Sequence, residues 1–305
     1  MDREFAALLE SLPSMDLADV PALRALLARR PPRELTSRPN LDIRHLTVPG
    51  RDGPPVPIRL YVPRDRGHAS PGLVYCHGGG FVVGNLDSDH ERCVRLAAEA
   101  GVVVVSPDYR LAPEHRYPAA LDDCTAALTW LDASAADLAV DRSRLALGGT
   151  SAGGALAAGV ALRARDDQGP ELALLLLACP VTDSNLAGAS IREFWNSPGW
   201  NGASTMRMWA HYLPTDATPV TYAAPALAAS LSGLPPTEIV VADLDPLRDE
   251  GLLLGRRLAA EGVSVTVHQF ADVPHGFDTL LPRAETSMRS VATQVRALSA
   301  LATRT

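Results

Sequence analysis

The segment 149–153, a Gly-x-Ser-x-Gly pattern, constrains the fold of this chain more than any other feature. An apolar run at 145–147 leads into it, and the alanine-rich stretch that follows favours a helix. A strand that passes directly into a helix leaves Ser151 on a sharp turn, where a side chain at Gly149 or Gly153 would collide with neighbouring backbone. Backbone N–H groups at the start of the helix would then suit a developing oxyanion. Because glycine-rich connections without chemistry show the same pattern, it needs support from the rest of the chain.

Continuous apolar runs alternate with helical patterns along most of the chain, which predicts a mainly parallel sheet covered by helices on both faces. In such sheets, functional residues gather at the carboxyl ends of the strands. Apolar and polar residues alternate in the last expected strand, which is typical of an edge strand. The expected strands are 43–48, 58–62, 73–76, 102–105, 145–147, 174–178, 239–242 and 263–270. The expected helices are 90–100, 118–130, 152–165, 246–261 and 284–302, besides helical segments within 1–30.

The region 184–225 interrupts this alternation, because it holds no clear strand and carries three of the four tryptophans with few charges. An apolar, aromatic insertion of this kind predicts a lid over an acyl pocket. The same aromatics could instead form a small core of the insertion itself, and we expect a minority of them to face substrate. The candidate substrate-binding residues are Phe81, Trp195, Trp200, Trp209 and Tyr212.

Composition and charge exclude several kinds of partner. A net charge of −7 and a pI of about 5.6 argue against a nucleic-acid partner.

The four cysteines are scattered without metal-like spacing, and Asp2 and Glu4 do not fit a signal peptide. We therefore expect reduced, mostly buried thiols in a cytoplasmic protein. The uncharged stretch 145–162 approaches the length of a membrane span, but its five glycines favour a buried strand and helix. No metal or organic cofactor is indicated.

Two later strand ends supply candidates for an orienting acid and a base, in the order Ser, Asp, His. Asp245 follows the strand 239–242, and its carboxylate could hold a histidine in one tautomer, although Asp before Pro is also a common helix start. Asp243 and Asp249 are rivals for this role. His275 lies in a loop directly after the last strand, between Pro and Gly, and is the candidate base.

A glycine triplet, Gly78, Gly79 and Gly80, follows the strand 73–76. Glycines allow N–H groups to turn into a site without a Cβ in the way. Together with the N–H of Ala152, these residues could form an oxyanion hole.

Four stretches of the sequence together resemble the bacterial hormone-sensitive-lipase family (family IV) of carboxylesterases, and 108–114 also fits that family. The four are His77-Gly78-Gly79-Gly80, Gly149-Thr150-Ser151-Ala152-Gly153-Gly154, Asp245-Pro246-Leu247-Arg248-Asp249-Glu250 and His275-Gly276-Phe277. The resemblance runs from about residue 40 to the C-terminus. Thr150 stands where many members have Asp, which resembles the Gly-Thr-Ser-Ala-Gly-Gly branch.

This resemblance implies an α/β-hydrolase fold with an eight-stranded, mostly parallel sheet and a helical cap. The catalytic domain would comprise 41–183 and 226–305, and the cap 1–40 and 184–225. The resemblance further implies a catalytic triad of Ser151, Asp245 and His275. It also implies that Gly79, Gly80 and Ala152 are oxyanion donors, that Gly78 shapes the loop, and that His77 and Asp108 are structural supports.

We therefore expect a serine carboxylesterase that hydrolyses short- to medium-chain esters through an acyl-enzyme, without metal or cofactor and without a membrane or nucleic-acid partner. The base must be neutral to act, so activity should fall at acid pH as His275 becomes protonated. An amidase or peptidase on the same triad, and a hydrolase-like receptor without catalysis, are the alternatives; the complete triad favours an enzyme. The alternating strand 263–270 could pair with a second copy in a homodimer.

Overall fold

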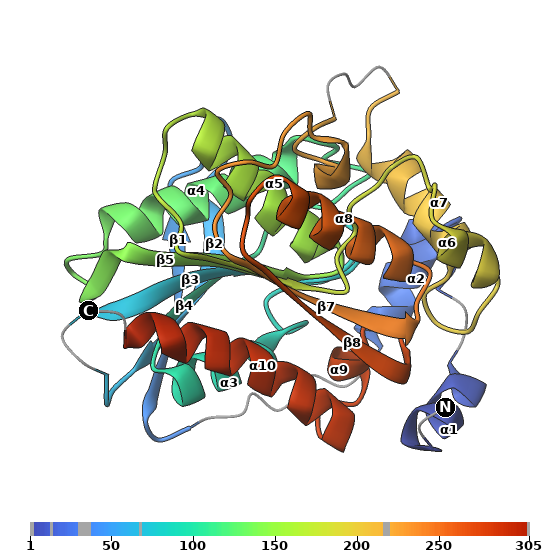
Figure 1. Cartoon of the computed structure of the whole chain (residues 1–305), viewed down its shortest axis with the longest axis horizontal. Helices are drawn as coiled ribbons and strands as arrows, with labels where there is room; N and C mark the ends of the chain where they lie inside the picture. Colours follow the sequence, from blue (N-terminus) through green and yellow to red (C-terminus); the bar gives the residue numbers. More distant parts are fainter. Residues whose placement is uncertain (1–2, 13–14, 30–37, 67–68, 216–219, 304–305) are drawn as a thin grey trace.

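The computed structural model of the chain describes residues 3–12, 15–29, 38–66, 69–215 and 220–303, which form one sheet with helices on both of its faces (Figure 1). Within these residues the sheet has eight strands in the order β1-β2-β4-β3-β5-β6-β7-β8. The pairs β1–β2 and β2–β4 are antiparallel, and all pairs from β4 to β8 are parallel, as the sequence predicted. The strands are β1 (Leu41–Val48), β2 (Val56–Pro63), β3 (Ser70–Cys76), β4 (Val103–Pro107), β5 (Val140–Thr150), β6 (Leu174–Ala178), β7 (Thr237–Leu244) and β8 (Val265–Pro274).

Helices cover both faces of this sheet (Figure 1). Buried side chains of α4, α5 and α8 form one core with the upper face, and those of α3 and α10 form a second core with the lower face. The helices are α1 (Arg3–Ser11), α2 (Val20–Ala28), α3 (His90–Ala100), α4 (Ala119–Ala133), α5 (Ala152–Asp166), α6 (Ala189–Glu193), α7 (Gly202–Tyr212), α8 (Arg248–Ala260), α9 (Phe277–Leu280) and α10 (Glu285–Ala302), with a short 3-10 helix η1 (Pro225–Leu227).

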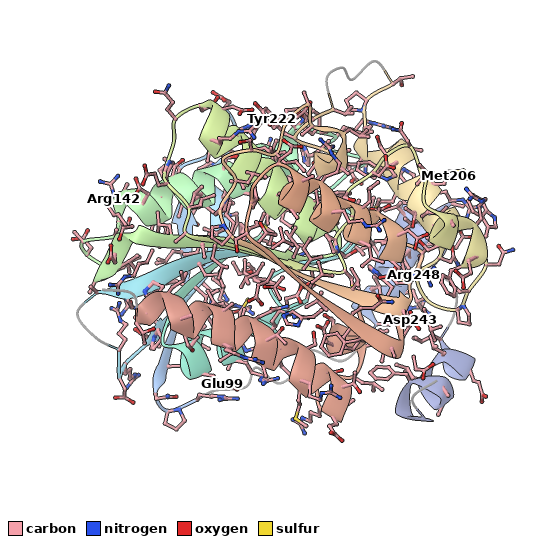
Figure 2. All side chains as sticks on the ribbon, viewed as in Figure 1. Glu99, Arg142, Met206, Tyr222, Asp243 and Arg248 are labelled. Atoms are coloured by element: carbon pink, nitrogen blue, oxygen red, sulfur yellow. The ribbon has the colours of Figure 1, made fainter. Side chains whose placement is uncertain are left out.

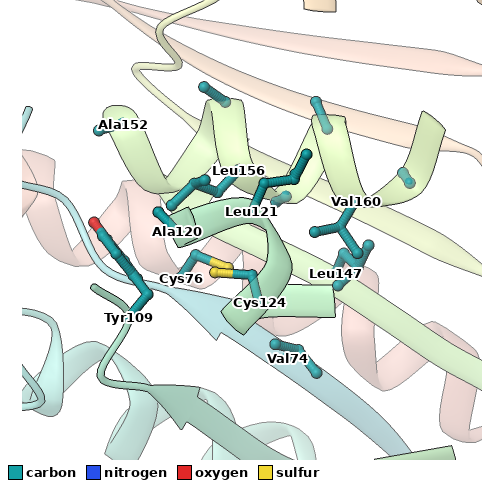
Figure 3. Close-up of a cluster of buried hydrophobic side chains, with 14 of the residues drawn as sticks. Val74, Cys76, Tyr109, Ala120, Leu121, Cys124, Leu147, Ala152, Leu156 and Val160 are labelled. Atoms are coloured by element: carbon teal, nitrogen blue, oxygen red, sulfur yellow. The ribbon is translucent and has the colours of Figure 1, made fainter. Parts of the chain in front are cut away.

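The core on the α4 and α5 side lies directly beneath the start of α5 (Figure 3). Leu121 from α4, Leu147 from β5 and Leu156 from α5 are fully buried there. Cys76 and Cys124 point toward each other in the same core (Figure 3). All four cysteines are free and buried, which confirms the prediction of buried thiols. This packing fixes the height of α5 above the sheet, and therefore the height of the turn that precedes it.

The structure shifts the expected bounds of most elements by a few residues, and two of these corrections concern elements that carry the site. β5 begins five residues before the expected apolar run, at Val140, because polar residues of the strand extend beyond the buried part of the sheet. Helix α8 begins at Arg248 rather than at 246, since the carbonyl of Asp245 accepts the Arg248 N–H and closes a turn first. The uncharged stretch 145–162 forms the end of β5 and most of α5, and within the described residues no helix is long and apolar enough to cross a membrane.

Two segments far apart in the sequence meet at one end of the molecule, where residues 15–17, just before α2, contact α7 and the loop that precedes it. The Met15 N–H donates to the Gly199 carbonyl at 3.1 Å, and His211 Nε2 donates to the Leu17 carbonyl at 2.7 Å. These contacts join the N-terminal segment to 184–225. Residues 1–2, 13–14, 30–37 and 216–219 of the expected cap lie outside the described part.

Candidate active site

The turn between β5 and α5 holds Ser151 in a backbone conformation that residues other than glycine seldom adopt, with φ 56° and ψ −117°. Such a conformation costs about 1–3 kcal/mol and persists only where the surroundings enforce it. A Cβ on Gly149 would lie 2.2 Å from the Gly153 carbonyl oxygen, and one on Gly153 would lie 2.0 Å from the Cys76 carbonyl oxygen. Both distances are far below any real contact, so only glycine allows this close approach, as the sequence predicted.

Ser151, His275 and Asp245 come together at the carboxyl ends of three strands and form a continuous hydrogen-bonded chain. His275 Nδ1 lies 2.8 Å from Asp245 Oδ2, and His275 Nε2 lies 2.9 Å from Ser151 Oγ. A carboxylate only accepts hydrogen bonds, so Nδ1 carries the hydrogen and the Ser151 hydroxyl donates to Nε2. This arrangement can move a proton from the serine hydroxyl to the imidazole.

Asp245 is buried, and both of its carboxylate oxygens accept hydrogen bonds. Its Oδ1 accepts the Leu247 N–H at 2.8 Å, so one carboxylate both begins the turn before α8 and orients His275. The rivals point elsewhere: Asp249 Oδ2 accepts the Ser190 N–H at 2.8 Å, and Asp243 Oδ1 accepts from the Gln269 side chain. Arg248 lies beside Asp243 in Figure 2 and donates to its carbonyl at 2.9 Å. Only Asp245 among the three contacts the imidazole.

The glycine triplet after β3 divides into two parts. The Gly78 N–H donates to Asp89 Oδ2 at 3.1 Å, so this amide is already used and its residue shapes the loop. Within the described residues, the N–H groups of Gly79, Gly80 and Ala152 donate to no other protein group. Three unpartnered amides at a nucleophile elbow are the arrangement that an oxyanion requires.

The five aromatic candidates lie at different distances from the triad. The Trp200 ring lies 5.8 Å from the His275 ring between centroids, and it also covers Gly80, where a Cβ would come within 2.7 Å of the indole. Phe81 is buried and stacks on Tyr212 at 3.7 Å, with the Trp209 ring 5.9 Å from Phe81, and all three belong to the large core on the α4 and α5 side. Trp195 is 37% exposed and packs against Gly202. Trp200 is therefore the aromatic side chain that the structure places beside the triad.

His77 and its neighbours support the loop from beneath. The His77 ring stacks on Tyr109 at 4.1 Å, and its Nδ1 donates to the Gly78 carbonyl at 2.8 Å. Burial lowers the pKa of His77, which keeps the ring neutral, and burial raises the pKa of Asp108. His77 and Tyr109 thus support the backbone of the loop, and the supporting role of Asp108 stays a prediction.

One group of potential metal-ligating atoms occurs in the described part of the chain, and it overlaps the triad. Cys179 Sγ, a carboxylate oxygen of Asp245 and a ring nitrogen of His275 lie within 4.8 Å of one another. The Asp245 and His275 atoms already share a hydrogen bond, and burial raises the pKa of the Cys179 thiol well above its usual value. The residues present therefore fit a proton-transfer site better than a metal centre.

A cluster of buried charges next to these loops was not predicted from the sequence. Asp89 and Arg92 lie at the start of α3, and Asp278 lies in α9, three residues after His275. Their only sequence signal is the i, i+3 spacing of Asp89 and Arg92, which is also common on solvated helix faces.

Comparisons with known proteins find ester hydrolases of the same fold. A family described as alpha/beta hydrolase fold matches residues 73–279. Carboxylesterase NlhH of Mycobacterium tuberculosis is 40% identical over 314 residues, which cover 98% of this chain and 97% of NlhH. Esterase LipI of the same organism is 40% identical over 245 residues, covering 78% of this chain and 76% of LipI. The solved structure of a bacterial heroin esterase has a TM-score of 0.94 and 39% identity, and covers 100% of this chain and 98% of that one.

Proposed function

Because this chain belongs to the α/β-hydrolase family, of the hormone-sensitive-lipase (family IV) type, and is a carboxylic ester hydrolase, we propose that it cleaves short- to medium-chain esters through an acyl-enzyme on Ser151. The observation that carries this proposal is the hydrogen-bonded chain from the Ser151 hydroxyl through His275 to Asp245, next to three unpartnered amides.

In the first half-reaction, His275 Nε2 takes the proton of the Ser151 hydroxyl as Oγ attacks the ester carbonyl carbon. The carbonyl oxygen becomes an oxyanion, which accepts hydrogen bonds from the amides of Gly79, Gly80 and Ala152. The imidazolium then donates its proton to the leaving alcohol, and the acyl group stays on Ser151.

In the second half-reaction, His275 removes a proton from a water molecule that attacks the acyl carbonyl. Collapse of the tetrahedral intermediate returns the proton to Ser151 Oγ and releases the carboxylic acid. Asp245 stabilises the imidazolium in both steps, and its buried position keeps water from competing for the Nδ1 hydrogen.

Hydrolysis of p-nitrophenyl esters, from acetate to palmitate, by the wild type and by Ser151→Ala tests this proposal. We expect turnover on acetate to octanoate, little on palmitate, and no turnover above background in Ser151→Ala. A folded wild type that hydrolyses none of these esters, or a variant that keeps wild-type turnover, would contradict the proposal.

Two other functions could use the same elements. An amidase or peptidase needs the same nucleophile and base, so p-nitroanilide analogues of the best ester should be measured beside it; we expect much slower turnover. A non-catalytic receptor has no need of an aligned base, whereas here both hydrogen bonds of the triad are formed. The geometry therefore favours the enzyme.

We further propose that segments 1–40 and 184–225 act together as a cap over the acyl pocket. Hydrogen bonds between them, and the Trp200 ring beside His275, support this. We also propose that the protein acts in a reducing cytoplasm, and the free, buried cysteines in the described part of the chain support this.

The outer edge of the sheet supports a homodimer as a further part of the proposal. Among the described residues no strand pairs with the far side of β8, and the surface next to it carries the exposed side chains of Leu253 and Val267. An unpaired strand beside apolar side chains favours pairing with a second copy. Sedimentation of the wild type should give a dimer and that of Val267→Arg a monomer; a monomeric wild type would contradict this part.

A further inference from the structure

A cluster of three buried charges joins the loops that carry the proposed active site. It consists of Asp89, Arg92 and Asp278, whose side chains are 3%, 4% and 1% exposed. Arg92 Nε donates to Asp89 Oδ1 at 3.3 Å, and Arg92 Nη2 donates to Asp278 Oδ1 at 2.6 Å. The guanidinium thus bridges two carboxylates from distant parts of the sequence. We refer to these three residues as the Asp89 cluster.

Asp89 connects the cluster to two of the loops. Its Oδ2 accepts the Gly78 N–H at 3.1 Å, next to the amides proposed to hold the oxyanion. Its Oδ1 accepts the Thr150 hydroxyl at 3.0 Å, one residue before Ser151. Thr150 also shares a hydrogen bond of 2.8 Å with the Tyr75 hydroxyl. One carboxylate therefore sets the distance between the glycine loop and the nucleophile turn.

Asp278 connects the cluster to the loop of the base. It lies in α9, three residues after His275, and its Oδ2 accepts the Ser290 hydroxyl of α10 at 2.7 Å. Arg92 also reaches Gln294 of α10 at 3.3 Å. The base loop is thus fixed to α10 and, through Arg92, to Asp89.

Charge keeps this cluster together. Burial on its own lowers the pKa of Arg92, but Asp278, Tyr75 and Asp89 raise it well above its usual value, so the guanidinium stays charged. Buried ion pairs contribute little net stability compared with apolar packing, while loss of one partner leaves an uncompensated charge. A purely structural role would therefore be served as well by apolar side chains. What apolar side chains lack is the fixed direction of the hydrogen bonds to Gly78 and Thr150.

We propose that the Asp89 cluster is a positioning device for catalysis, which holds the oxyanion loop, the nucleophile turn and the base loop in register. This inference rests on the proposed function, because register matters only if the three loops act in one reaction. Misplacement of about 1 Å at a catalytic group can lower a rate on the order of 100-fold.

Asp89→Asn tests the proposal with almost no change of shape. The amide has a single acceptor oxygen, so it can serve either the Gly78 N–H or the Thr150 and Arg92 donors, but not both. We expect kcat on p-nitrophenyl acetate to fall about 10- to 100-fold with KM within about threefold, because the lost alignment matters in the transition state.

Asp123→Asn is the matched control. Asp123 is 3% exposed and, like Asp89, accepts both a backbone N–H and a guanidinium, here those of Arg110 at 2.9 Å. It contacts none of the three loops through these bonds. We expect its urea midpoint to fall about as much as that of Asp89→Asn, with kcat within about threefold of the wild type.

A double-mutant cycle separates positioning from general loosening. If Asp89 and Asp278 act through Arg92 as one unit, the effects of the two substitutions should not multiply. The fold-loss of kcat in Asp89→Asn/Asp278→Asn should then be at least about fivefold smaller than the product of the two single fold-losses. Should Asp89→Asn not fold, Thr150→Val removes the hydrogen bond from the nucleophile turn to Asp89, together with the one to Tyr75, and leaves the Gly78 and Arg92 bonds in place. It should lower kcat about 3- to 10-fold at unchanged KM.

Three results would overturn the inference while the wild type still hydrolyses esters. The first is a kcat of folded Asp89→Asn, or of Thr150→Val where Asp89→Asn does not fold, within about twofold of the wild type. The second is an equal loss in Asp123→Asn, and the third is a fully multiplicative cycle. A wild type without esterase activity would instead count against the proposed function itself.

Discussion

Replacing Gly153 by alanine perturbs one of the closest backbone contacts around the nucleophile. The added Cβ would lie 2.0 Å from the Cys76 carbonyl oxygen and 2.5 Å from the His77 carbonyl oxygen. An ordinary contact begins at 3.4 Å, so α5 and the end of β3 must separate by about 1.4 Å. Both opposing atoms belong to the backbone, and no side-chain rotation can relieve the overlap.

The size of the effect follows from this displacement. Overpacking of a well-packed interior costs about 1–3 kcal/mol and occasionally more. With about 3 kcal/mol, the melting temperature should fall by roughly 5–10 °C. The same shift moves Ser151 and the Ala152 amide away from the glycine loop that follows β3, and a misplacement of about 1 Å can cost on the order of 100-fold in rate.

Steady-state hydrolysis of p-nitrophenyl acetate and thermal unfolding by circular dichroism measure both effects. We expect kcat of Gly153→Ala to fall at least about 100-fold at a temperature where the variant is folded. Gly169→Ala is the control, because Gly169 follows the other end of α5 and its Cβ would meet atoms only at 3.5 Å. This control should stay within about 0.5 kcal/mol of the wild type. A Gly153→Ala enzyme with near wild-type kcat would refute the reasoning about the turn.

Three more predictions address the acid, a buried carboxyl group and the cap. Asp245→Asn should lower kcat on the order of 10⁴-fold, because the amide no longer holds the Nδ1–H tautomer of His275; steady-state kinetics measures this, and a loss below tenfold would argue for another acid. Burial raises the pKa of Glu250 well above its ordinary value of 4.5, although the Thr182 N–H opposes this, so the folded protein keeps a proton that the unfolded chain releases. The corresponding stability is fully present below pH 4.5 and is lost as pH rises toward the raised pKa. Urea unfolding should therefore show Glu250→Gln, which stays neutral, gaining on the wild type between pH 5 and pH 8, and parallel curves would contradict the assignment. Trp200→Ala should raise kcat/KM for p-nitrophenyl octanoate relative to acetate by about tenfold, because the indole narrows the space beside the triad; an unchanged ratio would remove Trp200 from the pocket.

Most of the sheet could be predicted from the sequence because buried parallel strands are continuously apolar. The run 174–178 and the helix 90–100 agree with the observed bounds of β6 and α3. The first part of β5 could not be found in this way, since residues such as Asp141 and Arg142 extend beyond the buried sheet and look like a loop.

Part of the candidate site could be predicted from the sequence for a related reason. Each of Ser151, Asp245 and His275 follows a strand, and parallel strands end at one edge, so their proximity could be expected. The choice between Asp245 and its neighbours Asp243 and Asp249 could not be made from spacing alone. It depends on the turn before α8, which directs only Asp245 toward the imidazole.

Two features depended on tertiary packing and left little trace in the sequence. In 184–225, Trp209 and Tyr212 join the large core because α7 packs Tyr212 against Phe81, while the Trp200 ring lies beside His275. Asp89 and Arg92 look like residues of a solvated helix start, and only the approach of α9 and α10 buries them.

The proposed mechanism requires that Ser151 becomes covalently acylated, and labelling with diethyl p-nitrophenyl phosphate probes the nucleophile itself. This reagent transfers its phosphoryl group to an activated serine hydroxyl and releases p-nitrophenol. Trypsin cleaves after Arg144 and Arg163, so the peptide 145–163 carries Ser151 and can be fragmented by mass spectrometry. We expect one diethylphosphoryl group per chain, located on Ser151, with esterase activity lost in proportion to labelling. Loss of activity with the label on another residue, or full labelling of Ser151 with activity retained, would contradict it.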